Sequence, residues 1–149
     1  MKKGILIAGF VFAAAAGLFL TVPRSLRAQT GCDATSLNGV FGYHLTGEVY
    51  DRQGYIYYLA ASGSLNADGN GAFSGGDTLS LDGTVGKRKF TGTYTINADC
   101  TGSAQFNISD GAALGNGANY DILITDGGKQ LNLIQTDTAF IFSGTAKKQ

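Results

Sequence analysis

The fold of this chain is indicated most clearly by residues 90–109, which read FTGTYTINADCTGSAQFNIS. From Phe90 to Ile96, apolar or small residues alternate with threonines, and a similar alternation resumes after a cluster of turn-forming residues, NADCTG. A period of two residues places alternate side chains on opposite faces of a strand, one packed and one in water. The stretch therefore predicts two antiparallel strands joined by a short turn, Lys87–Ile96 and Ser103–Ser109.

The same alternation and the same turn residues recur along the chain, and helical periodicity is nearly absent. Six further strands are expected at Asn38–Tyr50, Tyr55–Leu65, Ala72–Leu81, Ala118–Thr125, Gln130–Thr136 and Thr138–Ala146. Short connections make consecutive strands antiparallel neighbours, and a meander of this length removes its two edges by closing on itself. We therefore predict an all-β fold, an eight-stranded antiparallel meander barrel, with a two-sheet β-sandwich as the alternative.

The first 28 residues have the features of a cleaved secretory signal peptide. Lys2 and Lys3 provide a basic start, an uncharged and mostly apolar run follows, and Ala28 is a small residue at a suitable cleavage position. The apolar run is short for a membrane span. We expect cleavage after Ala28, one β-barrel domain over residues 29–149, and export to the periplasm or the extracellular space. An uncleaved anchor is the alternative.

The chain has two cysteines, Cys32 and Cys100, and both lie in the part that we expect to be exported. Two thiols in an oxidising compartment usually pair. A bridge between them would close a loop of about 70 residues and would stabilise the fold by about 4 kcal/mol in the loop-entropy account. We therefore expect a disulfide between Cys32 and Cys100, with two free thiols as the alternative.

The composition excludes several classes of function. The chain of 149 residues is formally neutral, but the part after Ala28 keeps seven basic against eleven acidic side chains. A net-negative domain is a poor nucleic-acid binder, because phosphate neutralisation supplies most of that affinity. One histidine and two cysteines do not make a zinc site of the usual kind. We expect no nucleic-acid partner, no metal and no cofactor, and the oligomeric state stays open.

Four motifs have a structural explanation beside a functional one. The sole histidine, His44, falls on the expected solvent face of its strand, and no nucleophile can be paired with it. Residues 66–77 carry Asn or Asp at calcium-loop spacings, but a hairpin turn explains the same residues. Lys87-Arg88-Lys89 is either a solvated rim or a contact for an anion at one barrel mouth. Four tyrosines within Tyr50–Tyr58 form either a binding rim or part of the core.

The segments Leu37–Tyr43, Asn66–Gly71 and Thr91–Gly102 share a distinctive pattern of turns and glycines, and the third is the most specific. In this pattern the chain resembles a group of small exported bacterial proteins whose fold is similar to the allene oxide cyclase or calycin barrels. The resemblance implies the barrel fold and the position of the cysteine, and it carries no catalytic residue onto this chain. It also implies that the barrel can bind an apolar molecule or act as a cyclase by shaping a substrate.

The strand alternation supplies the candidate ligand site. An open barrel interior would be lined by inward-facing side chains, namely Phe41, Tyr43, Leu45, Tyr57, Leu59, Phe106, Ile108, Tyr120, Ile122, Phe140 and Phe142. An eight-stranded barrel can instead be filled by such side chains as a dry core, and the sequence leaves both states open. We predict a non-catalytic binding module for a small apolar ligand in the barrel interior.

Two other functions stay open. A cyclase or isomerase needs an inward polar group among the aromatic residues, and the positions of Asp121, Glu48 and His44 decide this hypothesis. A structural or adhesive surface module would use the tyrosine-rich segment Tyr50–Tyr58 for its contacts.

Overall fold

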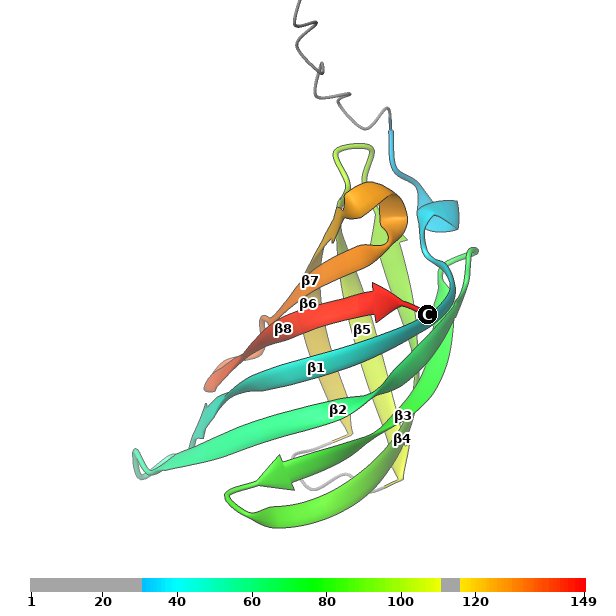
Figure 1. The fold of residues 1–149 in the computed structure, drawn as a ribbon. Coiled ribbons are helices and arrows are strands. Elements are labelled where there is room, and N and C mark those ends of the chain that lie inside the picture. Colours follow the sequence, from blue (N-terminus) through cyan, green and yellow to red (C-terminus); the bar gives the residue numbers. More distant parts are fainter. Residues whose placement is uncertain (1–30, 111–115) are drawn as a thin grey trace, which may run out of the picture.

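The chain forms a barrel of eight strands in the computed structural model, which describes residues 31–110 and 116–149 (Figure 1). The strands are β1 (Asn38–Tyr50), β2 (Ile56–Asp68), β3 (Ala72–Leu81), β4 (Thr84–Ile96), β5 (Thr101–Asp110), β6 (Gly117–Thr125), β7 (Gln130–Gln135) and β8 (Phe140–Lys148). Each strand is antiparallel to the next one in the sequence, and β8 pairs with β1 to close the barrel. The predicted meander barrel is confirmed, and the alternative of a β-sandwich is wrong.

The predicted signal segment, residues 1–28, lies outside the described residues. The two described helices are short 3-10 turns, η1 (Ala34–Ser36) and η2 (Asp126–Gly128). Within residues 31–110 and 116–149, no helix has the length and apolar character needed to cross a membrane.

Tight turns account for the main differences from the predicted strand bounds. β4 begins at Thr84 rather than Lys87, because the turn before it consists only of Asp82-Gly83, both with positive φ. β2 continues to Asp68, whose carboxylate accepts hydrogen bonds from the backbone N–H groups of Asn70 and Ala72 and so holds the turn. The other bounds differ from the prediction by at most two residues at each end.

The period-two alternation separates the inside of the barrel from the outside. Along β6, for example, every second residue is buried and the residues between them are exposed. Gly92 leaves the space that the Phe73 ring fills, since a Cβ at this glycine would lie 2.2 Å from Cζ of the ring. Within the barrel, aromatic rings with centroids 4.6 to 6.3 Å apart form a continuous chain made by Tyr43, Phe90, Phe73, Phe106 and Tyr120.

One end of the barrel is closed by the segment before β1, which we call the plug (residues 32–37). Leu37 of the plug is 3% exposed, and its carbonyl accepts a 2.8 Å hydrogen bond from the Tyr94 hydroxyl. The expected disulfide between Cys32 and Cys100 is present and ties the plug to the turn between β4 and β5. The plug therefore fills this end of the barrel with an apolar side chain that is anchored covalently.

The opposite end, which we call the mouth, lies where β1, β3, β5 and β7 end (Figure 1). Four inward apolar side chains at the mouth are only partly buried, namely Val49, Leu81, Ile108 and Phe140. The two ends of the barrel therefore differ in degree, since the mouth has four such side chains, whereas Ala34 and Ile96 are the partly buried apolar residues at the plugged end.

Candidate functional site

A row of residues in register across four strands brings charged side chains into the barrel. Tyr43 on β1 lies opposite Gly63 on β2, and Gly63 lies opposite Asp77 on β3. Asp77 in turn lies opposite Arg88 on β4. We call Tyr43, Asp77 and Arg88 the polar cluster. It is positioned entirely by strand register, so the barrel itself is the scaffold of the site.

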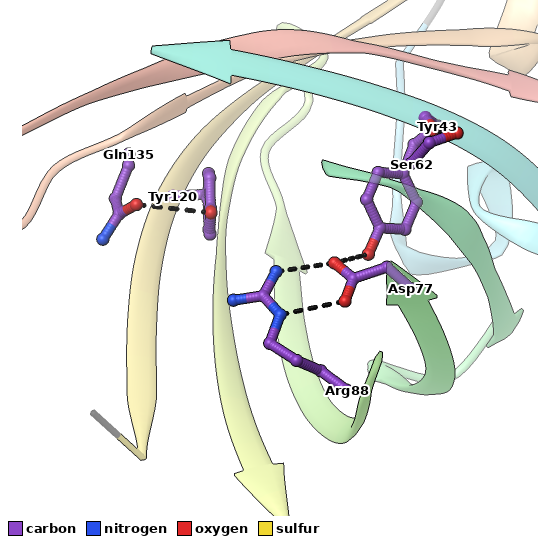
Figure 2. Close-up of polar contacts among 6 residues, drawn as sticks. All are labelled: Tyr43, Ser62, Asp77, Arg88, Tyr120 and Gln135. Atoms are coloured by element: carbon purple, nitrogen blue, oxygen red, sulfur yellow. Dashed lines mark hydrogen bonds and ion pairs between the residues drawn. The ribbon is translucent and has the colours of Figure 1, made fainter. Parts of the chain in front are cut away.

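Asp77 is the centre of the polar cluster (Figure 2). Its Oδ1 accepts a 2.9 Å hydrogen bond from Nε of Arg88, and its Oδ2 accepts hydrogen bonds from Nη2 of Arg88 at 2.6 Å and from the Tyr43 hydroxyl at 2.7 Å. The side chain of Asp77 has no exposed area, and that of Arg88 is 11% exposed. The carboxylate is therefore held by three donors away from water, as a buried charge requires.

Burial and hydrogen bonding fix the protonation states of its two donors. Burial raises the pKa of Tyr43 far above its ordinary value, and the hydrogen bond to Asp77 raises it further. Burial alone would lower the pKa of Arg88, but the hydrogen bonds and the charge of Asp77 outweigh it and the net shift is upward. Tyr43 therefore stays a neutral donor and Arg88 stays a cation at physiological pH.

A second set of polar side chains faces Arg88 from β6 and β7. The Tyr120 hydroxyl donates a long, 3.4 Å hydrogen bond to Oε1 of Gln135, whose Nε2 donates to Oδ2 of Asp137 at 2.9 Å. Burial raises the pKa of Tyr120, so its hydroxyl keeps its proton. In Figure 2, Arg88 lies between Asp77 and Tyr120, and its Nη1, the nitrogen that does not bond Asp77, is on the side of Tyr120.

A cavity of about 20 Å³ is bounded by side chains of this set and of the mouth. It is lined by Leu59, Arg88, Ile108, Gly117, Ala118, Tyr120, Gln135, Phe140 and Phe142. A second cavity of about 20 Å³ lies toward the plug and is lined mainly by apolar side chains. Each has room for about one water molecule, whereas a drug-sized ligand needs at least about 300 Å³. The sequence left open whether the barrel interior is open or filled by side chains, and in the structure it is filled.

Most of the predicted lining residues point into the barrel. Eight of them are buried, namely Phe41, Tyr43, Leu45, Leu59, Phe106, Tyr120, Ile122 and Phe142. Ile108 and Phe140 face inward but are only partly buried, because they lie at the mouth.

Tyr57 is the exception, and its predicted place in the interior is wrong. It is 36% exposed at the rim of the mouth, where its hydroxyl bonds to Oδ2 of Asp51 at 3.4 Å. The alternation does place Tyr57 on the inner face of β2. However, the ladder between β2 and β3 ends at Leu59 and Leu81, so no β3 residue pairs with Tyr57 to cover it.

The three residues on which the cyclase hypothesis depended do not face the interior. His44 and Asp121 are exposed on the outer face of the barrel. Glu48 is half-buried on that same face and accepts a 2.9 Å hydrogen bond from the Tyr50 hydroxyl. The inward acidic group is instead Asp77, and both of its oxygens are engaged by the polar cluster.

The calcium-loop spacing in residues 66–77 is divided between two faces of the hairpin. Asp68 holds the turn between β2 and β3, whereas Asp77 points into the barrel. Over the described part of the chain, no group of three or more His, Cys, Asp or Glu side chains is placed to hold a metal ion. The basic run Lys87-Arg88-Lys89 is also split between the two faces of its strand, since Lys87 and Lys89 are exposed and Arg88 faces inward.

The sequence analysis considered Asp77 only in the calcium-loop spacing and Arg88 only in the basic run, and it missed the pairing of the two, although a signal for it was present. Asp77 lies five positions before the two-residue turn Asp82-Gly83, and Arg88 lies five positions after it. A tight hairpin therefore places the two residues directly opposite each other. Asp77 also alternates in step with Leu79, and Arg88 with Phe90, which places both on the apolar face. An acid and a base at matching inward positions predict a buried ion pair.

Comparisons with known proteins support the fold. The chain matches no known family model and no curated protein. Its barrel is similar to that of a redesigned beta barrel, mFAP1, bound to DFHBI, with 18% identity and a TM-score of 0.52 over 77% of this chain and 97% of that chain. It is also similar to EF1p2_mFAP2b bound to DFHBI, with 13% identity and a TM-score of 0.51 over 82% of this chain and 99% of that chain. At such identities the likeness shows the barrel fold alone.

Proposed function

We propose that this protein is an exported barrel that binds a small, largely apolar ligand at its mouth. The observation that carries the proposal is the difference between the two ends of the barrel. The plug fills one end, whereas the mouth leaves Val49, Leu81, Ile108 and Phe140 partly exposed to water. Apolar side chains around a few buried polar groups are the usual composition of a small-molecule site.

The ligand binds across the mouth rather than deep in the barrel. The cavity below the mouth has a volume of about 20 Å³, so it accepts a single small group of a ligand and not its whole body. The apolar body therefore lies among the four partly exposed side chains, and one small group reaches the cavity beside Arg88 and Tyr120.

Two further observations favour this function. The two similar barrels are both bound to DFHBI, so a barrel of this architecture is able to hold a small ligand. The disulfide between Cys32 and Cys100 is typical of a protein from an oxidising compartment, which favours export and is in accord with the predicted signal peptide.

Native mass spectrometry of the protein purified from its own secretion route tests the proposal directly. We expect a non-covalent adduct of a few hundred daltons that is lost under denaturing conditions. Its mass would give the chemical class of the natural ligand. A bare chain that also fails to bind the apolar dye phenylnaphthylamine would overturn the proposal.

A matched pair of variants places the site on the barrel. Ile108→Glu puts a charge among the apolar side chains of the mouth and should weaken dye binding about tenfold or more. Leu123→Glu puts the same charge on the outer face of β6, at a residue that is 43% exposed, and should leave dye binding unchanged. Equal loss in the two variants, with both folded, would contradict a site at the mouth.

A further inference from the structure

Arg88 keeps hydrogen-bonding capacity that the barrel does not use. Its Nε and Nη2 bond to Asp77, and Nη1 makes no hydrogen bond with any described residue. Because no buried side-chain nitrogen or oxygen in the described residues lacks a partner, Nη1 must retain contact with solvent. Arg88 lines the cavity below the mouth together with Tyr120 and Gln135, and its Nη1 is on the side of Tyr120 (Figure 2). An ordered donor that faces an opening is a ready contact for a ligand.

The charge balance of the polar cluster decides which ligand group suits this donor. Asp77 already neutralises the guanidinium of Arg88, and the phenols of Tyr43 and Tyr120 are neutral. A ligand carboxylate would therefore leave one uncompensated negative charge against apolar walls, which is costly. A neutral acceptor, such as a carbonyl oxygen, needs only the donor and adds no charge.

The size of the cavity also favours a small neutral acceptor as the ligand group that enters it. A volume of about 20 Å³ matches one water molecule or one carbonyl oxygen. The hydroxyl of Tyr120 is a second possible donor, since its hydrogen bond to Gln135 is long at 3.4 Å and is readily exchanged for a better one.

From these contacts we infer that the ligand is a neutral molecule with an apolar body and a carbonyl or similar acceptor group, which Nη1 of Arg88 and the Tyr120 hydroxyl bind in the cavity. This inference rests on the proposed function and adds the ligand class to it. The body packs at the mouth, and the acceptor replaces a water molecule beside Arg88.

Three naphthalene probes of similar size separate the possibilities: acetonaphthone with a neutral carbonyl, ethylnaphthalene with no acceptor, and naphthoate with a carboxylate. We expect the protein to bind acetonaphthone about tenfold or more tightly than ethylnaphthalene, because the added hydrogen bond is to a charged donor. We also expect naphthoate to bind more weakly than acetonaphthone. Fluorescence titration measures all three affinities.

Two variants test whether Arg88 causes the preference for acetonaphthone over ethylnaphthalene. The triple variant Tyr43→Phe/Asp77→Leu/Arg88→Met replaces the whole polar cluster by apolar groups and leaves no partner unpaired. It should lose most of the preference for acetonaphthone over ethylnaphthalene, because the Tyr120 hydroxyl is then the donor that remains in the cavity. Lys87→Met removes a neighbouring exposed cation and should keep the preference of the unaltered protein.

The outcomes distinguish this inference from the proposed function. Equal binding of acetonaphthone and ethylnaphthalene by the unaltered protein would overturn the inference and leave the proposed function standing. Tightest binding of naphthoate would overturn the neutral ligand class. Failure of every probe to bind would overturn both. The probe series on the unaltered protein decides the question even where the triple variant does not fold.

Discussion

The hydroxyl of Tyr43 donates a 2.7 Å hydrogen bond to Oδ2 of Asp77, although β1 and β3 are not neighbouring strands. The strand between them, β2, contributes Gly63 at the same level of the barrel. The absence of a side chain there lets the phenol pass over β2 to the carboxylate. The register of three strands and one glycine thus builds a contact that no pair of adjacent strands can make.

Gly63→Ala should therefore destabilise the barrel by about 2 kcal/mol or more, as overpacking in a core does. A Cβ at Gly63 would lie 2.3 Å from the carbonyl oxygen of Gly76 and 2.5 Å from Cβ of Asp77, so the β2–β3 ladder must shift. Urea unfolding followed by circular dichroism measures the change. Gly86→Ala is the control, because a Cβ at Gly86 has no atom within 4 Å and its cost should stay below about 0.5 kcal/mol. Equal stabilities of the two variants would contradict this account.

The buried ion pair should show strong non-additivity. Asp77→Leu leaves Arg88 buried without its counter-charge, and Arg88→Met leaves Asp77 buried without its own. Each single change should therefore lower the free energy of unfolding by about 3 kcal/mol or more. The double variant removes both charges, so its loss in the free energy of unfolding should be much smaller than the sum of the two single losses. A double-mutant cycle from urea unfolding gives the coupling free energy. Additive single effects would show that the pair is not coupled.

The fold was predictable because its determinants are local in the sequence. Alternation along residues 90–109, together with turn residues at short intervals, indicates antiparallel neighbours. The requirement to remove sheet edges then selects a closed barrel. The disulfide was predictable for a similar reason, since the chain offers two cysteines and one possible pairing.

The candidate site was only partly predictable, because it depends on register across strands. Alternation identifies inward residues such as Tyr120 but does not state which of them meet. Tyr57 shows that alternation also does not predict burial. Its side chain faces inward, but it lies where β2 extends past its neighbour β3 and is therefore exposed. Whether an inward residue is covered depends on the lengths of adjacent strands, and these were known only to within a few residues.

Removal of the disulfide should act on the plug more than on the mouth. In Cys32→Ser/Cys100→Ser we expect a loss of up to about 4 kcal/mol in the free energy of unfolding, because the unfolded chain is no longer cross-linked. Hydrogen exchange should also accelerate at the backbone amides of Ser36 and Leu37, which bond within the plug. Unchanged exchange at these amides would show that the Tyr94 hydrogen bonds hold the plug without the bridge.

Asp137 should make the stability of the mouth depend on pH. Burial would raise the pKa of this carboxyl, but its hydrogen bonds from Asn119 and Gln135 outweigh burial and lower the pKa from its ordinary value of 3.8. A lowered folded-state pKa means that the carboxylate stabilises the fold above the unfolded-state pKa. This contribution is lost as the pH falls through the folded-state value.

Asp137→Asn should therefore be less stable than the unaltered protein by about 1 to 2 kcal/mol between pH 6 and 8, and the difference should shrink below about pH 4. Thermal unfolding across this pH range measures the effect. Asp126→Asn is the control, because Asp126 is an exposed carboxylate in the turn at the plugged end and its side chain makes no hydrogen bond or ion pair within the described residues. Its stability difference from the unaltered protein should stay near zero throughout. A difference for Asp137→Asn that stays constant down to pH 3 would contradict the role given to its charge.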